Sequence, residues 1–210
     1  MSIQRGHVAP DLASEFPSLA LHWIPVEACS GRSPHPVRER LREMSNRISG
    51  AKAIQMRQEA VPWAYRVFFR QVGIDPDEHR TPAEEVVLDR LKHGGFPSRN
   101  LLDDAITIAT FETGVPLVAF DADQVEPPLA LRLARPDELM GSAGRPLSSG
   151  QIVIADERRP LAVLFADRDP ACGVTPQTER MVLATVQVEG VPDIAVEECL
   201  WTVEEILSGA

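Results

Sequence analysis

Residues 99–123, RNLLDDAITIATFETGVPLVAFDAD, leave the chain little freedom in its local structure. Apolar residues recur there at helical spacing after an acidic pair, and carboxylates are favoured near the positive end of a helix dipole, so we predict a helix over residues 102–113. Gly114 can adopt the left-handed conformation that ends a helix, and Pro116 prevents the helix from continuing. The apolar residues 117–120 then predict a short strand.

The remaining patterns place helices mainly in the first half of the chain and strands in the second. Helical spacing predicts helices near residues 37–48 and 62–72, a helix that begins at the capping box of Thr81 and Glu84, and a last helix near residues 196–207. Apolar runs predict strands at residues 19–26, 117–120, 129–133, 151–155, 161–165 and 181–188. Helices followed by strands indicate an α+β domain rather than a βαβ nucleotide-binding fold.

Composition and motifs exclude several classes of protein. The 210 residues, 44% of them apolar, suit one globular domain, and they include neither a run of roughly 18 apolar residues that would span a bilayer nor the apolar core of a signal peptide. We therefore expect a cytoplasmic protein that does not bind membranes. The three cysteines are far apart and the five histidines scattered, so no metal site is expected. Glycine-rich phosphate-binding motifs are missing from the sequence, so no cofactor is expected either.

Charge is unevenly distributed along the chain. The formal net charge is −10, which argues against a broad surface for nucleic acid, yet residues 31–70 carry nine Arg and Lys against three Glu, a local charge of +6. This basic block could contact an RNA backbone through Arg38, Arg42, Arg47 and Arg57, or it could contact an acidic protein. It could equally form solvated helix faces and internal ion pairs.

Six motifs follow one another between residues 65 and 190. They read YRVFFRQVGIDP, RNLLDDAIT, GVPLVAFDAD, LRLARPDELM, GQIVIADE and ADRDPACGVTPQTERMVLATVQVEG. In this order they resemble the freestanding members of the B3/B4 family, whose namesake is the editing domain in the β subunit of phenylalanyl-tRNA synthetases. The resemblance implies an α+β fold with N-terminal helices and a central β-sandwich-like sheet system. Residues 61–210 are expected to form the B3/B4-like domain, and residues 1–60 an N-terminal strand and basic helical extension packed on its core.

The resemblance also implies a protein that acts near aminoacyl-tRNA, but several pocket positions of the family carry other side chains here. The helix asparagine of the synthetase domain falls on Thr107, and the histidine of the following strand falls on Val118. A Gly-Gly turn in a later loop falls on Arg168 and Asp169, and the glutamate that recognises the tyrosine hydroxyl falls on Ala184. A site without its hydrogen-bond partner loses most discrimination for that hydroxyl, so tyrosine-specific editing is not supported.

Hydrolysis of an aminoacyl ester needs a positioned water, donors for the developing oxyanion, and an acceptor for the ammonium group. The resemblance matches Asp104 to the family's helix aspartate, and Asp104 or Asp169 could bind the ammonium. The candidate catalytic residues are Asp104, Thr107, Arg168 and Asp169. The candidate substrate-binding residues are Arg99, Asn100, Val118, Thr175, Thr178 and Ala184.

Each polar candidate also has a structural interpretation. Asp104 could only cap its helix, and Arg99 with Asn100 could shape the turn before that helix. Arg168 and Asp169 could form a local ion pair, while the two threonines could satisfy backbone groups. Two hypotheses therefore stand. The chain is either an editing-like domain that binds and hydrolyses an aminoacyl-tRNA or related aminoacyl substrate, or a non-catalytic module that binds tRNA or an acidic protein through its basic block.

Overall fold

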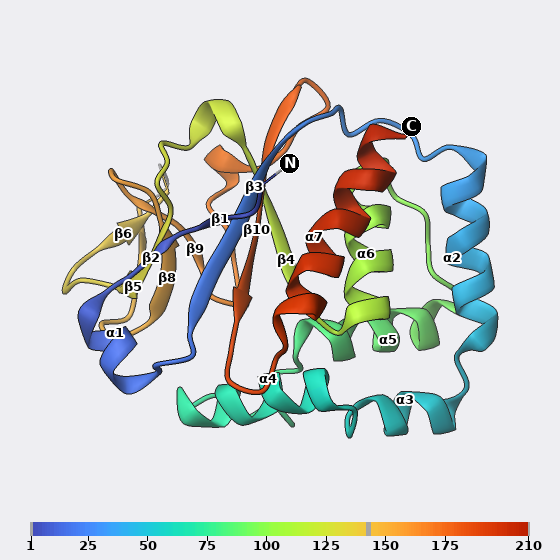
Figure 1. Cartoon of the computed structure of the whole chain (residues 1–210), viewed down its shortest axis with the longest axis horizontal. Coiled ribbons are helices and arrows are strands. Elements are labelled where there is room, and N and C mark those ends of the chain that lie inside the picture. Colours follow the sequence, from blue (N-terminus) through green and yellow to red (C-terminus); the bar gives the residue numbers. More distant parts are fainter. Residues whose placement is uncertain (1, 142–143, 210) are drawn as a thin grey trace.

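Two four-stranded sheets form the β part of the computed structural model, which describes residues 2–141 and 144–209 (Figure 1). The central sheet has the strand order β1 (Gln4–Arg5), β3 (Ala20–Glu27), β10 (Arg180–Gln187) and β4 (Leu117–Asp121). The second sheet has the order β2 (His7–Val8), β5 (Ala130–Leu133), β8 (Ile152–Ala155) and β9 (Pro160–Val163). A short antiparallel pair, β6 (Leu139–Met140) and β7 (Arg145–Pro146), contacts β9.

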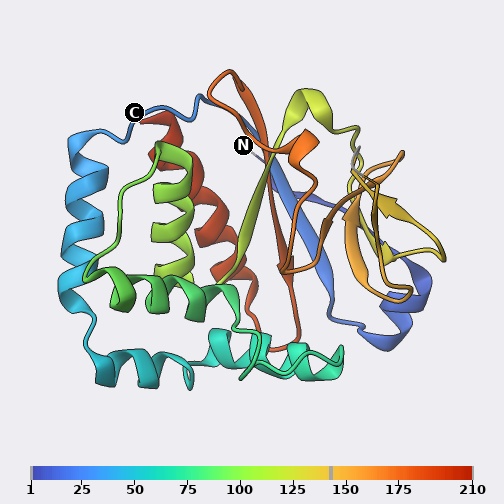
Figure 2. The same ribbon diagram turned by 180° about the vertical axis from the view of Figure 1, so that it is seen from behind.

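Most of the helices lie on the other side of the central sheet or below it (Figure 1), whereas α1 (Pro10–Glu15) contacts β5 of the second sheet. The others are α2 (His35–Arg47), α3 (Gly50–Met56), α4 (Ala60–Gln71), α5 (Pro82–His93), α6 (Leu101–Thr113) and α7 (Asp193–Ser208), with 3-10 turns η1 (Ala122–Gln124) and η2 (Pro170–Cys172). Figures 1 and 2 show α7 and α6 beside the central sheet, α2 outside α6, and the second sheet on the opposite side. None of the helices in the described ranges is long and apolar enough to cross a membrane.

The expected α+β class is confirmed, and the predicted helices and strands occur within a few residues of their expected positions. One strand end was predicted wrongly. The strand expected over residues 161–165 ends at Val163, because Phe165 adopts a left-handed φ of 57° that no strand continues. The Phe165 ring packs on Tyr65 and Phe69 with centroid distances of 5.6 and 5.3 Å, and these contacts offset the backbone strain.

Other small elements have no counterpart in the predictions. Strands β1 and β2 have two residues each, and helices α1 and α3 have six and seven. Elements this short complete at most two turns or one alternation, so they leave no periodic signal in the sequence. Their positions depend on pairing with longer elements, as β1 pairs with β3.

The predicted helix signals operate as expected around α5 and α6. The Thr81 backbone N–H donates to Glu84 Oε2 at 3.0 Å within the capping box of α5, and Asn100 caps α6 by accepting from the Asp103 N–H at 2.8 Å. Gly114 ends α6 with a φ of 75°, and a Cβ at that position would lie 2.9 Å from a carbon of Pro62. The turn between α6 and β4 therefore requires glycine both for its backbone conformation and for space.

The N-terminal residues contribute directly to the central sheet. Strand β3 pairs with β10 over its whole length, from Ala20 opposite Gln187 to Glu27 opposite Arg180. The predicted apolar face of α7 is buried, and it covers the ladder with Val196, Leu200, Val203 and Leu207. Apolar burial stabilises by about 25 cal/mol per Å², so this contact between distant parts of the sequence stabilises the core.

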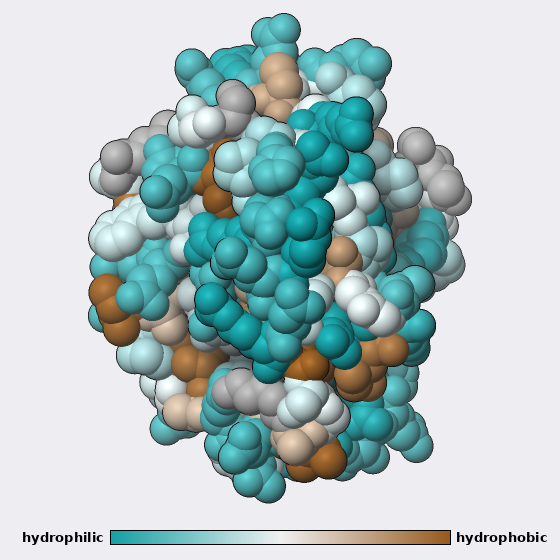
Figure 3. Space-filling model, turned by 90° about the vertical axis from the view of Figure 1, so that its right-hand side faces the viewer, coloured by the Kyte–Doolittle hydropathy of each residue, from teal (hydrophilic) through white to brown (hydrophobic). Residues whose placement is uncertain are grey.

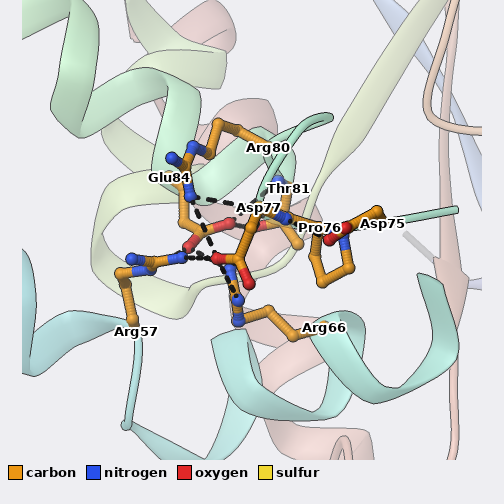
Figure 4. A network of polar contacts seen from close by, with 8 residues as sticks. All are labelled: Arg57, Arg66, Asp75, Pro76, Asp77, Arg80, Thr81 and Glu84. Carbon is orange, nitrogen blue, oxygen red and sulfur yellow. Dashed lines mark hydrogen bonds and ion pairs between the residues drawn. The ribbon is translucent and has the colours of Figure 1, made fainter. Parts of the chain in front are cut away.

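A network of ion pairs joins α4 and α5 to the segments that follow α3 and α4 (Figure 4). Arg66 of α4 is 4% exposed and donates to Glu84 of α5 at 2.7 Å and to Asp77 at 2.7 Å. Arg57 donates to Glu84 at 2.6 Å and also pairs with Asp77. The GIDP motif of residues 73–76 ends next to Asp77, and the Pro76 carbonyl accepts from Arg66 at 3.2 Å. This motif therefore braces α4 against α5.

Both carboxylates of the network are held in their charged form. Hydrogen bonds from Arg66 and Arg57 lower the pKa of Asp77 from 3.8 to about 2. Burial by itself raises the pKa of Glu84, but hydrogen bonds from Thr81 and Arg57 outweigh that effect, so the pKa is lowered overall. The network is consequently charged on both sides at neutral pH.

Glu84→Gln tests how much the buried pair contributes. The substitution keeps the shape of the side chain and leaves the Arg66 guanidinium without its buried counter-charge, which typically costs about 3–5 kcal/mol. We expect the free energy of unfolding, measured by urea denaturation, to fall by that amount. Glu78→Gln removes an exposed carboxylate from the preceding loop and should change it by roughly 0.5 kcal/mol or less. Equal losses in the two variants would contradict the assignment.

Candidate functional site

Asp104 lies at the first turn of α6 and is 1% exposed. One carboxylate oxygen accepts from the hydroxyls of Ser33 and Ser98, both at 2.5 Å, and the other accepts from the Arg99 backbone N–H at 2.9 Å. The carboxylate thus joins the loop before α2 to the connection between α5 and α6. These three donors occupy the group that the sequence suggested as an ammonium ligand.

The neighbouring candidates also make local contacts. Asn100 caps α6 and accepts from the Ser30 hydroxyl at 2.9 Å, so the predicted role in shaping this turn is confirmed. Thr107 donates its hydroxyl proton to the Asp103 carbonyl at 2.7 Å. The Arg99 side chain extends away from α6 and pairs with Asp89 of α5 at 2.9 Å, where both side chains are partly exposed.

Arg168 and Asp169 do not pair with each other, so the local ion pair considered from the sequence is wrong. Asp169 is 1% exposed, pairs with Arg159, and accepts from the Ala171 N–H at 2.9 Å at the start of η2. Arg168 points the other way and donates to the Ala119 carbonyl of β4 at 2.6 Å. Consecutive residues in an extended segment present their side chains to opposite sides, which explains the separation.

Thr175 and Thr178 belong to the turn that leads into β10. The Thr178 hydroxyl donates to Asp121 at 2.6 Å and accepts from the Thr175 N–H at 3.0 Å. Asp121 ends β4, so the turn is fastened to the end of the neighbouring strand. The expected role in satisfying backbone groups is confirmed for this pair.

Val118 and Ala184 are opposite each other in the ladder between β4 and β10. Gln187 of β10 bonds to Asp193 of α7, so odd-numbered residues of β10 face the helices and Ala184 faces the second sheet. Ala184 is completely buried and Val118 partly buried. Two apolar side chains fill the position where the resemblance places a histidine and a glutamate.

The predicted residues therefore do not form one site. Arg168 contacts β4, and Val118 and Ala184 belong to β4 and β10, whereas Asp104 lies in the first turn of α6. Of the candidate catalytic and substrate-binding residues, Arg99 and Thr107 line a cavity of about 510 Å³, which we call the α5–α6 cavity.

The α5–α6 cavity combines both signs of charge with an apolar floor. Its cations are Arg80, Lys92 and Arg99, its carboxylates are Glu85 and Asp89, and its apolar residues include Phe96, Ile106 and Leu117. Burial and the nearby Asp89 raise the pKa of Glu85, an effect that Lys92 partly opposes. Two carboxylates held this close favour the approach of a cation.

Sequence reasoning missed Glu85 and Asp89. Both lie in the predicted helix that begins at the capping box, and a spacing of four residues places them on one helix face. That spacing could have identified the pair from the sequence. The cavity beside the pair could not be predicted from the sequence, because it forms where α5 meets α6 and β4.

The basic block does not form a single surface. Figure 3 looks onto the side that carries α2, which is mainly hydrophilic. Arg38 and Arg42 line a cavity between α2 and the end of α5, whereas Arg47 lines a separate one with Arg40 and acidic residues. Arg57 is engaged in the network of Figure 4, as the internal ion-pair alternative proposed.

The cysteines and the other potential metal ligands do not form a site within the described residues. Cys172 and Cys199 are buried free thiols, and burial raises their pKa to about 11 and about 12. Cys29 is exposed. No cluster of three or more His, Cys, Asp or Glu side chains that could hold a metal ion occurs in residues 2–141 and 144–209.

Asp104→Ala separates a structural from a ligand-binding role. Without the carboxylate, three donors lose their acceptor, and each buried unsatisfied group costs about 1–3 kcal/mol, so we expect the free energy of unfolding to fall by at least about 3 kcal/mol. Thr107→Val removes one hydrogen bond within a helix and should cost under about 1 kcal/mol. Urea denaturation measures both; an Asp104→Ala variant as stable as the parent would contradict the clamp.

Comparison with known proteins places these features in a family. The model of the B3/4 domain matches residues 64–192. The phenylalanine–tRNA ligase β subunit of Psychrobacter arcticus is 35% identical over 98 residues, which cover 45% of this chain and 12% of that protein. The β subunit of Dechloromonas aromatica is 30% identical over 107 residues, covering 50% and 14%.

A solved structure is also similar. It is an N-terminal fragment of the phenylalanyl-tRNA synthetase β subunit from Pyrococcus horikoshii, with a TM-score of 0.44 and 12% identity, covering 98% of this chain and 52% of that one. The chain matches only about an eighth of the length of the curated relatives. Since the family model matches more than half of its residues, the chain belongs to the B3/4 domain family.

Proposed function

We propose that this chain binds the aminoacyl end of a tRNA, or a related aminoacyl compound, in the α5–α6 cavity. The observation that carries the proposal is the lining of that cavity, where two carboxylates and three cations surround an apolar floor. The free ammonium group of an aminoacyl ester needs an anionic acceptor. Glu85, whose pKa is raised first by burial and then by the nearby Asp89, is the acceptor that we propose, and Asp89, which pairs with Arg99 at 2.9 Å, lies beside it.

The other lining residues suit the remaining parts of such a ligand. Phe96, Ile106 and Leu117 provide an apolar surface for the amino-acid side chain. Arg80 and Lys92 are cations at the same cavity and match the phosphate that follows the terminal nucleoside. A volume of about 510 Å³ is within the range of small-molecule sites, roughly 300–1,000 Å³.

A tyrosine pocket between the two sheets is not what we propose. The position matched to the family's glutamate is the fully buried Ala184, which faces the second sheet and does not line the α5–α6 cavity. A protein related to the curated synthetase subunits need not bind the same amino acid as they do. An apolar amino acid fits the floor of the α5–α6 cavity best.

Binding of a stable analogue tests the cavity. We expect 3′-deoxy-3′-(phenylalanylamino)adenosine, in which an amide replaces the ester, to bind at least about tenfold more weakly to the Glu85→Gln/Asp89→Asn variant, because charged hydrogen bonds are worth roughly 1.5–3 kcal/mol. Isothermal titration calorimetry measures the affinity. The N-acetylated analogue lacks the ammonium and should bind both proteins equally.

The matched control removes two carboxylates from α7, as Glu204→Gln/Glu205→Gln. These residues do not line the cavity, so the analogue should bind this variant as tightly as the parent protein. If both double variants lose affinity equally, the effect comes from net charge. The cavity assignment is then wrong.

Ester hydrolysis in the same cavity is a second candidate function. Glu85 has a raised pKa and is a stronger base than an ordinary carboxylate, and the Thr107 oxygen can accept a hydrogen bond from water because its own proton is given to Asp103. In this proposal water attacks the ester carbonyl and gives its proton to Glu85, and Arg99 stabilises the oxyanion. The bond between the carbonyl carbon and the ribose oxygen then breaks, and Glu85 returns its proton to that oxygen, which yields a free amino acid and uncharged tRNA.

A panel of correctly and incorrectly charged tRNAs tests this second function. Deacylation of at least one aminoacyl-tRNA should be faster than its uncatalysed rate, and Glu85→Gln and Thr107→Val should each slow it by about tenfold or more, as typical for loss of acid–base assistance. Thr175→Val removes a hydroxyl outside the cavity and should leave the rate unchanged. If no aminoacyl-tRNA is deacylated faster than its uncatalysed rate, the hydrolysis proposal is wrong and the binding proposal stands alone.

A further inference from the structure

A second polar cavity, of about 340 Å³, lies between α2 and the turn after α5, and we call it the α2–α5 cavity. His35, Arg38, Arg42 and Asn46 line it from α2, and Gly94 lines it from the end of α5. It shares Phe96 with the α5–α6 cavity. The two cavities therefore lie on either side of the segment that connects α5 to α6.

Charge distinguishes the α2–α5 cavity. Its lining holds two arginines and a histidine and includes no carboxylate. The α5–α6 cavity contains Glu85 and Asp89, and the cavity around Arg47 contains three glutamates. In a chain of net charge −10, a cavity with only cationic side chains among its charged residues concentrates a positive potential.

The arginines of this cavity are incompletely satisfied within the protein. The Nε atom of Arg38 is buried and has no hydrogen-bond partner among the described residues. Among the described residues Arg42 pairs with Glu39 alone, at 2.7 Å, and both side chains are exposed, so this pair contributes little and leaves the guanidinium accessible. A buried guanidinium nitrogen without an acceptor is costly unless a ligand supplies one.

The walls of the α2–α5 cavity are fixed in place. The Ser45 carbonyl of α2 accepts two hydrogen bonds from Arg90 of α5, at 3.1 and 2.8 Å, and the Ser45 hydroxyl accepts from the Phe96 N–H at 2.8 Å. Ser98 beyond it is held by Asp104. The arginines are thus presented from a helix whose distance from α5 is set by hydrogen bonds, which reduces the entropy lost on binding.

We infer that the α2–α5 cavity binds a phosphate group through Arg38 and Arg42, and that this phosphate belongs to an RNA backbone. Guanidinium groups donate two parallel hydrogen bonds to phosphate oxygens, and His35 at the first turn of α2 adds a further donor near the positive end of the helix dipole. RNA is favoured because the neighbouring α5–α6 cavity is the proposed aminoacyl site, so one ligand would carry both groups. The inference rests on the proposed function for this choice of source only.

The test measures binding of uncharged tRNA by fluorescence anisotropy over a range of salt concentrations. Arg38→Gln/Arg42→Gln should weaken binding at least about tenfold near 0.1 M salt and lower the slope of log Kd against log salt by about one. The matched control, Arg158→Gln/Arg180→Gln, removes two exposed arginines from outside the cavity and should change Kd less than about twofold. Circular dichroism checks that each variant is folded.

Inorganic phosphate distinguishes the two sources of the phosphate group. Phosphate should compete with tRNA for the parent protein and shift the amide signals of Gly94, Gly95, Phe96 and Ser98, and it should do neither in the Arg38→Gln/Arg42→Gln variant. If the variant loses phosphate but keeps tRNA, the site takes a small phosphate compound and the RNA source is wrong.

The proposed phosphate site is wrong if both double variants lose the same affinity for tRNA. It is also wrong if the Arg38→Gln/Arg42→Gln variant binds tRNA and phosphate as tightly as the parent protein. Neither ligand carries an aminoacyl group. Failure of the proposed function would therefore leave these measurements unchanged, and failure here would leave the analogue-binding test unchanged.

Discussion

The buried Asp104 carboxylate fixes the part of the molecule in which both cavities lie. Its hydrogen bonds to Ser33, Ser98 and the Arg99 N–H join the approach to α2, the α5–α6 connection and the start of α6. The connection it fixes separates one cavity from the other and contributes residues to both. A charged acceptor is suited to this task because its hydrogen bonds are stronger than those between neutral groups.

The central sheet explains why the residues matched by the family resemblance do not converge. Val118 and Ala184 face the second sheet, whereas Leu117 of the same strand lines the α5–α6 cavity on the helix side. Adjacent residues of a strand point to opposite faces, so a change of one position moves a side chain from one cavity to another. In this chain Glu85 and Asp89 therefore lie at the α5–α6 cavity, whereas the apolar Val118 and Ala184 lie between the sheets.

The ion pairs divide the basic block into arginines that support the fold and arginines that have few partners within the protein. Arg57 and Arg66 form ion pairs with Glu84 and Asp77, and these pairs hold α4 against α5. Arg38 and Arg42 lie on the outer helix α2 and lack comparable partners. Burial explains the division: an arginine between helices needs a counter-charge from the protein, while one at a cavity can take it from a ligand.

The sequence by itself determined the local elements and the family: the capping box at Thr81, the stop at Gly114 and the buried face of α7 all follow from short-range chemistry. Tertiary structure decided the rest. Three features depend on groups far apart in the chain. Phe165 leaves the strand and joins an aromatic cluster, Arg168 turns away from Asp169, and Glu85 borders a cavity. Side-chain direction and cavity shape arise from packing between elements, which local periodicity does not encode.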